Sequence, residues 1–309
     1  MSPSTDTPVS KLGSFAAAGA AACVAVTFTN PIETVKTRLQ LQGELVAGVS
    51  RLYSGPAQAV SLIYRTEGLR GLQQGLACAY AYQILLNGSR LGLYDPLRAA
   101  LGGCVLSDRR TYGTAALAVN ATAGAAAGMI GAALGSPLQL VKTRMQALAP
   151  RRVPPLPGRM GRRLVALFKD RGVRGLYQGV DAALLRTGVG SAVQLAVYSH
   201  AKEALSRHVP DGMALYTLAS ALSSVAVCIA MNPFDVAMTR MYHHRGGLYR
   251  GPLDCLCKTV RQEGFSALYK GHLAQLLRIA PHTILCLTLM EQALRVVRLV
   301  ENRLPQIRP

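Results

Sequence analysis

Long apolar segments alternate with polar segments along the chain, and the alternation repeats three times. Three uncharged segments exceed the ~20 residues that a helix needs to cross the apolar core of a bilayer. They span Leu12–Ile32, Thr111–Val141 and Met213–Phe234. A fourth, Leu72–Ser89, is just long enough, and two weaker segments around Val180–His200 and Gly271–Met290 are each interrupted by one arginine. The pattern predicts an all-α membrane protein with six transmembrane helices, two in each repeat.

Each of the three long uncharged segments runs into the same motif, in which a proline is followed by an acid or amide and then by one or two basic residues. The copies are Pro31–Arg38, Pro137–Arg144 and Pro233–Arg240. Copies that stand roughly 100 residues apart indicate repeated structural units rather than separate domains. We therefore expect three repeats, at residues 1–105, 106–209 and 210–309, and we expect the first helix of each to end near its motif.

A glycine-rich turn leads into the second helix of each repeat. Each turn follows a short amphipathic segment, and the turns are Glu67–Gly75, Arg171–Gly179 and Glu263–Gly271. Three residues stand 19 positions after the last glycine of their turns, and they are Tyr94, Tyr198 and Met290. This constant spacing indicates that the three second helices are structurally equivalent.

The chain is strongly basic, with 34 Lys and Arg against 15 Asp and Glu and a formal net charge of +19. Nucleic-acid binding would place basic residues on a soluble face with recognisable readout motifs, and the sequence contains no such module. We interpret the charge as basic loops and helix ends against an anionic membrane, with some residues lining a path for anions. The seven cysteines lack metal-binding spacing, so we expect no metal, no other cofactor and no enzymatic activity.

Three Pro-x-acid-x-x-base-x-base copies at this spacing resemble the mitochondrial carrier family over nearly the whole chain. The resemblance implies a threefold pseudosymmetric barrel of six helices in the mitochondrial inner membrane, with short amphipathic helices on the matrix side. It also implies a monomer with a central cavity that opens alternately to the two sides. Cardiolipin would bind at corners formed by Tyr53–Gly55 and Tyr249–Gly251 with the turn glycines, whereas the second-repeat corner around Pro157–Gly158 departs from the pattern.

In this family a gate of ion pairs closes the matrix side, and it joins the acid of one motif to the first base of the next. Carried over to this chain, Glu33 would pair with Lys142, and Asp235 would pair with Lys36. Polar side chains nine residues after each proline would brace these pairs, and they are Gln40, Gln146 and Tyr242.

The resemblance also implies a cytoplasmic gate at the ends of the second helices, which would pair Asp95 with Lys202 and Glu291 with Arg98. In each gate a third pair has lost its charge on both sides. These uncharged pairs are Gln139 with Met238, and Ser199 with Leu294. A buried charge without a partner is costly, so losses that occur in pairs support this pairing order. We expect two salt bridges in each gate and a looser seam between the second and third repeats.

Arginines within the predicted spans mark the substrate site, because charges inside membrane helices are costly and usually functional. Arg186 and Arg278 each stand seven residues after the last glycine of a turn, where the first repeat has Tyr82. Arg90 stands fifteen residues after the last glycine of its turn, further along its helix. No carboxylate lies near these arginines along the spans, because the acids of these segments belong to the gates or to the turns. We therefore expect about three uncompensated positive charges. An anion is their natural partner, since the planar arginine fork donates two parallel hydrogen bonds to carboxylate or sulfate.

The residues beside these arginines narrow the substrate class. Arg186 is followed by Thr187, a combination that resembles the keto-acid and carboxylate carriers of the family. His282, one turn beyond Arg278, either couples a proton to anion movement or is a core histidine. The pattern as a whole resembles the oxaloacetate- and sulfate-carrier branch, with its vertebrate members. It implies antiport of small dicarboxylates or oxoacids, such as oxaloacetate or malate, or of sulfur oxoanions.

Two other functions stay open. One is a proton or anion leak like that of the uncoupling proteins, which Tyr82 in place of an arginine disfavours. The other is a transport-inactive receptor or scaffold, which the intact motif prolines, turn glycines and cavity arginines disfavour.

Overall fold

The computed structural model describes residues 10–44, 52–105, 114–147, 160–207, 209–210, 213–244 and 248–303. Within these residues there is no strand, and the order of a long, a short and a long helix occurs three times. The helices of the first repeat are α1 (Lys11–Leu41), α2 (Pro56–Leu72) and α3 (Leu76–Val105). Those of the second are α4 (Thr114–Ala147), α5 (Met160–Leu176) and α6 (Val180–Ser206). The third has α7 (Met213–His243), α8 (Pro252–Glu263), a 3₁₀ turn at Phe265–Tyr269, and α9 (His272–Arg303).

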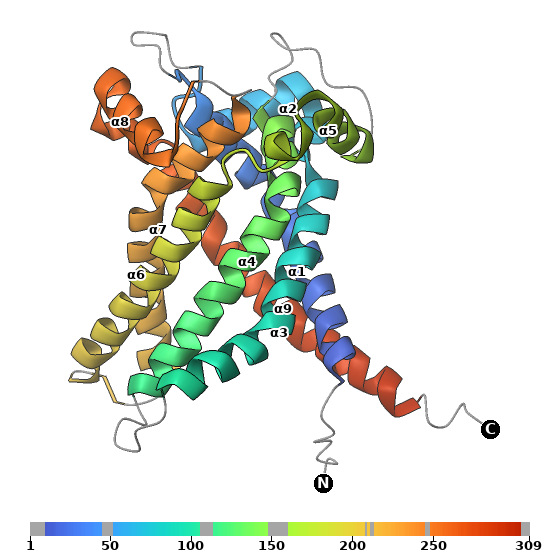
Figure 1. The fold of residues 1–309 in the computed structure, drawn as a ribbon, viewed down its shortest axis with the longest axis vertical. Helices are drawn as coiled ribbons and strands as arrows, with labels where there is room; N and C mark the ends of the chain where they lie inside the picture. Colours follow the sequence, from blue (N-terminus) through green and yellow to red (C-terminus); the bar gives the residue numbers. More distant parts are fainter. Residues whose placement is uncertain are drawn as a thin grey trace.

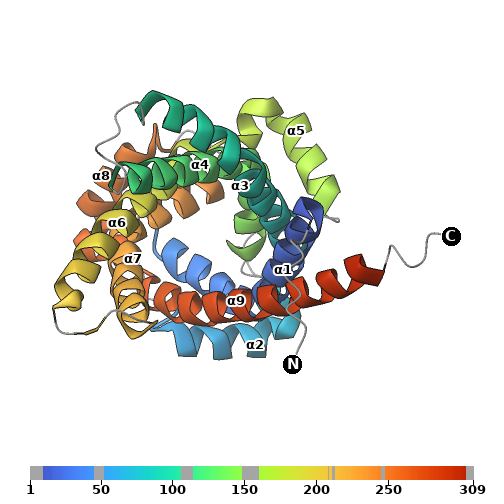
Figure 2. The same cartoon turned by 90° about the horizontal axis from the view of Figure 1, so that it is seen from below.

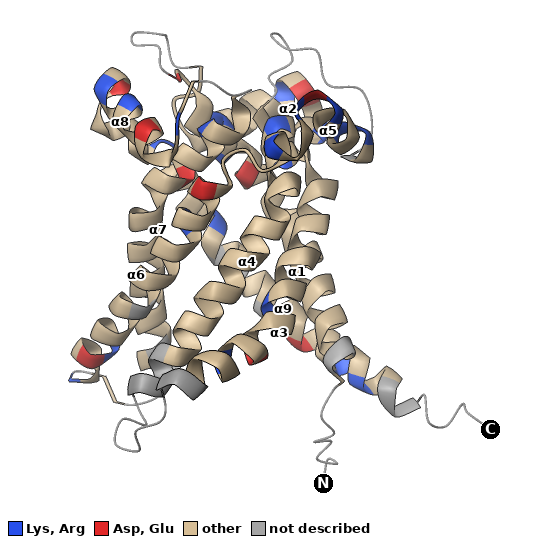
Figure 3. Cartoon of the chain, in the orientation of Figure 1, with Lys and Arg blue, Asp and Glu red and all other residues tan. Residues whose placement is uncertain are grey.

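The six long helices stand in a ring, in the order α1, α3, α4, α6, α7 and α9 (Figure 2). The most extensive contacts join the second long helix of one repeat to the first of the next, as in α3 with α4, α6 with α7, and α9 with α1. The short helices α2, α5 and α8 lie at one end, which we call the short-helix end, and α1 begins and α9 ends at the opposite end (Figure 1). Charged residues gather at the two ends, and few lie along the middle (Figure 3).

Five of the long helices are long and apolar enough to cross a membrane, and they are α1, α4, α6, α7 and α9. The sixth, α3, has sufficient length, with 30 residues, but Gln83, Asn87 and Arg90 interrupt its apolar sequence. It belongs to the same ring because it packs between α1 and α4. Polar groups on a helix of this kind are tolerated where they face the interior of a bundle.

Large apolar side chains point away from the ring while small ones fill the contacts between helices. Phe28 and Ile284 are 65% and 64% exposed. On α1, Ala17, Ala21 and Ala25 recur every fourth residue and are buried. In a membrane, helices associate through close packing of small residues, since lipid is as apolar as the side chains. The distribution therefore matches a ring whose outer surface faces lipid.

The first helix of each repeat continues through its proline and ends three residues after its motif, close to the motif as expected. Pro31, Pro137 and Pro233 all lie inside helices, which run on to Leu41, Ala147 and His243. A proline removes only one backbone hydrogen bond, and neighbouring groups can compensate for it inside a bundle. The acids and first bases of the motifs therefore lie on the helices themselves and face the interior of the ring.

The last glycine of each turn fastens one repeat to the next. Gly75, Gly179 and Gly271 have φ angles of 77°, 78° and 77°, a left-handed conformation that favours glycine. Each also lies against the first helix of the following repeat: a methyl group on Gly179 would stand 3.0 Å from the ring of Tyr242, and one on Gly271 would stand 3.1 Å from Gln40. The same contact therefore recurs around the ring.

Candidate substrate site and gate

A cavity of about 210 Å³ lies inside the ring, at the level of the proline motifs. All six long helices contribute to its wall. Six of the lining side chains are charged, and they are Glu33, Lys36, Lys142, Arg186, Asp235 and Arg278. Four of these groups are basic and two are acidic, so together they carry a net charge of +2.

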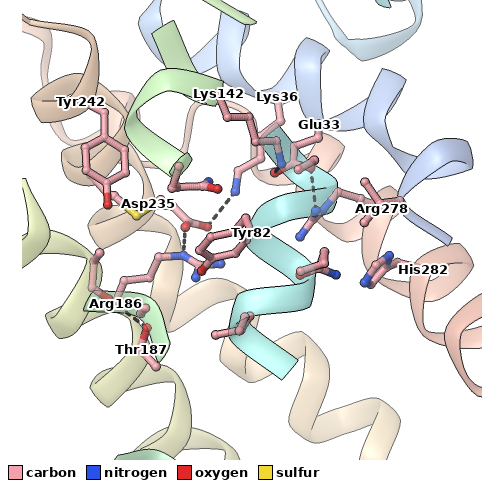
Figure 4. A pocket seen from close by; sticks show the side chains of 18 residues that line it. Glu33, Lys36, Tyr82, Lys142, Arg186, Thr187, Asp235, Tyr242, Arg278 and His282 are labelled. Carbon is pink, nitrogen blue, oxygen red and sulfur yellow. Dashed lines mark hydrogen bonds and ion pairs between the residues drawn. The ribbon is translucent and has the colours of Figure 1, made fainter. Parts of the chain in front are cut away.

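Asp235 of α7 contacts two basic side chains at once (Figure 4). Its Oδ2 accepts a hydrogen bond of 2.9 Å from Nζ of Lys36 on α1, and its Oδ1 accepts one from Nε of Arg186 on α6. Asp235 is 1% exposed, so water screens these ion pairs little. One carboxylate therefore joins helices from all three repeats.

Glu33 of α1 forms the matching arrangement on another side of the cavity. Its Oε1 lies 2.6 Å from Nζ of Lys142 on α4, and its Oε2 lies 3.1 Å from a terminal nitrogen of Arg278 on α9. Helices from all three repeats meet again at one carboxylate. We call each set of one acid, one lysine and one arginine an ionic station.

The third position of the pseudosymmetry has no charge. Gln139 stands in place of the acid, Met238 in place of the lysine and Tyr82 in place of the arginine. Met238 is buried, and within the described residues Oε1 of Gln139 has no hydrogen-bond partner. The Tyr82 ring lies so close to α4 that a methyl group on Gly135 would stand 2.6 Å from it. We call this set the neutral station.

The expectation of three uncompensated arginines is wrong for two of them. Arg186 and Arg278 contact Asp235 and Glu33, the acids predicted for the gate. Their positions along the helices predicted that the substrate arginines and the gate acids lie at different heights in the ring. An arginine side chain, however, reaches further than one helical turn of 5.4 Å. The predicted substrate arginines and the predicted gate acids therefore form one cluster.

The other predicted substrate residues divide between two places. Tyr82, Thr187 and His282 line the same cavity; the Thr187 hydroxyl donates to the carbonyl of Ala183 on its own helix, and Nδ1 of His282 lies 3.3 Å from the Thr29 hydroxyl. Arg90 does not reach this cavity. It lines a second and wider cavity of about 760 Å³, which also contains Tyr94, Asp95, Gln194 and Tyr198. The three arginines thus occupy two levels of the ring interior.

The predicted bracing residues join neighbouring first helices rather than contacting the ion pairs directly. Oε1 of Gln146 accepts from the Thr37 hydroxyl at 3.2 Å, and Oε1 of Gln40 accepts from the Thr239 hydroxyl at 2.8 Å. The Tyr242 hydroxyl lies 3.2 Å from that of Ser136. All three bracing residues are fully buried. They hold together the helices that carry the acids and lysines.

Sequence reasoning missed a second layer of ion pairs at the short-helix end. Arg38 and Arg240, the last residues of their motifs, form two-pronged ion pairs with Glu67 and Glu263 of the glycine turns. Nε of Arg38 also donates to the backbone carbonyl of Gln146 in the next repeat, at 3.1 Å. A signal was present in the sequence, because both acids directly precede the first glycine of their turns.

The second repeat has hydrogen bonds to backbone carbonyls in place of this ion pair. Arg171 stands where the other turns have a glutamate, and Arg144 donates instead to the carbonyls of Tyr242 and His244, at 2.8 and 3.3 Å. Gln178 adds a hydrogen bond of 2.6 Å to the carbonyl of His244. Repeats two and three are therefore joined here by an arginine and an amide that cap the end of α7.

The residues predicted for the cytoplasmic gate lie near the opposite end of the long helices. Asp95 lines the wide cavity, and Lys202 lies on α6 near its end. Arg98 and Glu291 are exposed and form no ion pair within the part of the chain that the structure describes. The predicted partners Arg98 and Glu291 are thus apart, while the acids and lysines of the motifs are in contact.

The chain belongs to the mitochondrial carrier protein family. The family model matches three successive stretches, at residues 7–103, 113–209 and 210–300. It is therefore a transporter of the six-helix carrier fold and a multi-pass protein of the mitochondrial inner membrane. In this fold, the short-helix end faces the matrix.

Several curated proteins resemble the chain over almost its whole length. It is 51% identical over 300 residues to the mitochondrial oxaloacetate transport protein of Saccharomyces cerevisiae, covering 96% of this chain and 93% of that protein. It is 47% identical to mitochondrial citrate transporter E of Aspergillus niger, with 94% and 95% covered. It is 42% identical to human solute carrier family 25 member 35, with 90% and 96% covered.

Proposed function

We propose that this carrier exchanges small dicarboxylates, oxoacids such as oxaloacetate, or sulfur oxoanions across the mitochondrial inner membrane by alternating access. The observation that carries the proposal is the cavity with a net charge of +2, into which Arg186 and Arg278 project beside Thr187 and Tyr82. A planar guanidinium recognises carboxylate and sulfate oxygens through parallel hydrogen bonds. Two such groups on different sides of one cavity suit a ligand with two negative charges.

The two gates would then open in turn. On the matrix side, the pairs Lys36–Asp235 and Lys142–Glu33 hold α1, α4 and α7 together. The wide cavity on the other side contains Arg90 and Asp95, and it gives an anion a path to the inner site. After the matrix pairs separate, Asp95 with Lys202 and Glu291 with Arg98 would close the cytoplasmic side.

The names of the relatives agree with an anionic substrate. The Saccharomyces cerevisiae relative is named an oxaloacetate transport protein, and the Aspergillus niger relative is named a citrate transporter. Oxaloacetate carries two carboxylates and citrate carries three. The charge count favours the smaller anion, because two negative charges neutralise the six charged side chains of the cavity.

Cardiolipin binding and a monomeric state are further parts of the proposal. Gly55 and Gly251 precede α2 and α8, and both helices begin with proline. The free backbone N–H groups at such helix starts can bind a phosphate. The third proposed corner, around Pro157–Gly158, lies outside the described residues.

A leak like that of the uncoupling proteins is the principal alternative, and mitochondrial uncoupling protein 1 of Arabidopsis thaliana is 33% identical to the chain. The neutral station favours exchange, because Tyr82 supplies a ring where a third arginine would raise the positive charge of the cavity. A transport-inactive receptor would have no need of two buried ionic stations, whose desolvation is costly.

Counter-exchange in liposomes tests the proposal. Purified carrier would be reconstituted into vesicles loaded with malate, and uptake of labelled oxaloacetate, malate, sulfate, citrate, phosphate or ADP would be measured. We expect uptake of the dianions that depends on internal malate. Uptake of ADP without dicarboxylate uptake would overturn the substrate class. Anion or proton flux without any internal substrate would favour the leak.

A further inference from the structure

We propose that Glu33 and Asp235 are resident occupants of the anion site: in the empty carrier they bind the substrate arginines, and an incoming anion has to displace them. The inference rests on the proposed function and adds a coupling between substrate and gate. A carboxylate of the protein stands where a carboxylate or sulfate of the substrate would bind. The gate acids thus bind the arginines in the way that a carboxylate of the substrate would.

The division of contacts on each carboxylate makes such a displacement possible. Asp235 uses Oδ2 for Lys36 and Oδ1 for Arg186. Glu33 likewise uses Oε1 for Lys142 and Oε2 for Arg278. Because the lysine and the arginine bind different oxygens, the arginine can turn to another anion while the lysine contact persists. The arginine contact is therefore separable from the gate contact.

The neutral station shows that acid, lysine and arginine belong together as one unit. Where Gln139 replaces the acid, Met238 replaces the lysine and Tyr82 replaces the arginine. An arginine that served only the substrate could be present without a gate acid beside it. The chain instead has all three charges at two positions and none at the third, as expected if the acid holds the arginine whenever substrate is absent.

The consequence is that substrate loosens the gate that confines it. In the empty carrier each gate acid is held by two cations from two other repeats. Once a dianion has engaged Arg186 and Arg278, each acid keeps only its lysine, so the ion pairs that must break to open the matrix side lose part of their support. An empty carrier would keep its gate held and would return slowly, which favours exchange over one-way transport.

A double-mutant cycle separates displacement from a general effect of charge. Binding of malate, and separately of sulfate, would be titrated to about 50 mM by calorimetry in detergent, with wild type, Asp235→Asn, Arg186→Gln and the double variant. We expect Asp235→Asn to tighten binding about tenfold, because it frees Arg186. In the Arg186→Gln background the same change should alter binding by less than about twofold.

A repulsive field from Asp235, acting without contact, would give the same tightening in both backgrounds, and that result would overturn the inference while leaving the proposed function intact. A wild-type protein that binds neither anion would overturn the proposed function as well. Glu33→Gln with Arg278→Gln forms an independent cycle at the second station. Thermal unfolding in detergent would identify any variant that fails to fold, and the other cycle then decides.

Discussion

At the scale of single residues, the site depends on which groups share a carboxylate. The resemblance to the carrier family was enough to place Glu33 near Lys142 and Asp235 near Lys36, because each residue matches a position of the family's motif. Spacing could not show that Arg186 and Arg278 reach the same acids, since that depends on the side-chain direction across two helices. The roles of these residues in transport stay a prediction.

A largely buried carboxylate outside the membrane-spanning segments, that of Glu44, gives a pH-dependent prediction. Burial raises the pKa of Glu44, which follows α1, although Tyr249 donates a hydrogen bond of 2.9 Å to it. For an acid whose pKa is raised by folding, stability is greatest below the unfolded pKa, ~4.3, and is lost as the pH rises through the folded pKa. Glu44→Gln should therefore raise the melting temperature in detergent at about pH 7 and raise it less at about pH 4.

The matched control is Asp254→Asn, on the exposed side of α8. The hydrogen bond from Lys258 lowers the pKa of Asp254, so its contribution is present above the unfolded pKa and is lost as the pH falls. Asp254→Asn should lower the melting temperature at neutral pH and have little effect in acid. The same sign of change for both variants would contradict the account.

At the scale of elements, the glycine turns decide how each repeat meets the next. The sequence located all three turns, and the structure adds what they contact. Gly75 packs on α4, Gly179 on α7 and Gly271 on α1. These contacts surround the C-terminal ends of the first helices, which carry the gate acids and lysines. The turns therefore lie against the proposed gate at the short-helix end.

Gly179→Ala should destabilise the carrier. The new methyl group would force a left-handed residue, which costs about 1–2 kcal/mol, and it would also stand 3.0 Å from the Tyr242 ring. We expect a clear fall in the melting temperature in detergent. Gly161→Ala is the control, because Gly161 lies in α5 with no atom within 4 Å of the added carbon. Equal melting temperatures for Gly179→Ala and wild type would contradict the turn's role.

At the scale of the whole molecule, the three seams between repeats are not alike. The seam between repeats two and three lacks the ionic contact at Gln139 and Met238. Sequence reasoning predicted that this seam is looser. The structure shows that Arg144 and Gln178 form hydrogen bonds across it to carbonyls at the end of α7. Whether the seam opens more easily stays a prediction, because these hydrogen bonds offset part of the missing ionic contact.

Restoring charge to this seam should slow exchange. In the double variant Gln139→Asp with Met238→Lys, a third ion pair would join α4 to α7, and Tyr82 offers no arginine through which substrate could loosen it. An added stabilisation of about 1.4 kcal/mol in the closed gate would slow opening about tenfold. Malate exchange in liposomes measures the effect. Gln139→Asp alone should lower stability instead, since it buries an unpaired charge. An unchanged exchange rate in the double variant would contradict the prediction.

The architecture of the whole molecule was easier to predict from sequence than its functional state. Three copies of the motif and three turns imply the ring of long helices and its three short helices, which the structure contains. The same copies cannot tell which gate is closed, because the sequence contains the residues of both gates whichever conformation the chain adopts. The contacts of Lys36 and Lys142, and the exposure of Arg98 and Glu291, are those expected if the proposed matrix gate is the closed one.

The most direct measurement compares malate counter-exchange in liposomes for wild type, Arg186→Ala, Arg278→Ala and the control Arg261→Ala. Arg186 and Arg278 line the charged cavity, whereas Arg261 is exposed on α8. Thermal unfolding would first verify that each variant is folded. We predict that either cavity variant loses at least about a hundredfold in exchange rate, while the control stays within about twofold of wild type. Undiminished exchange by folded Arg186→Ala and Arg278→Ala would contradict the claim that this cavity binds the transported anion.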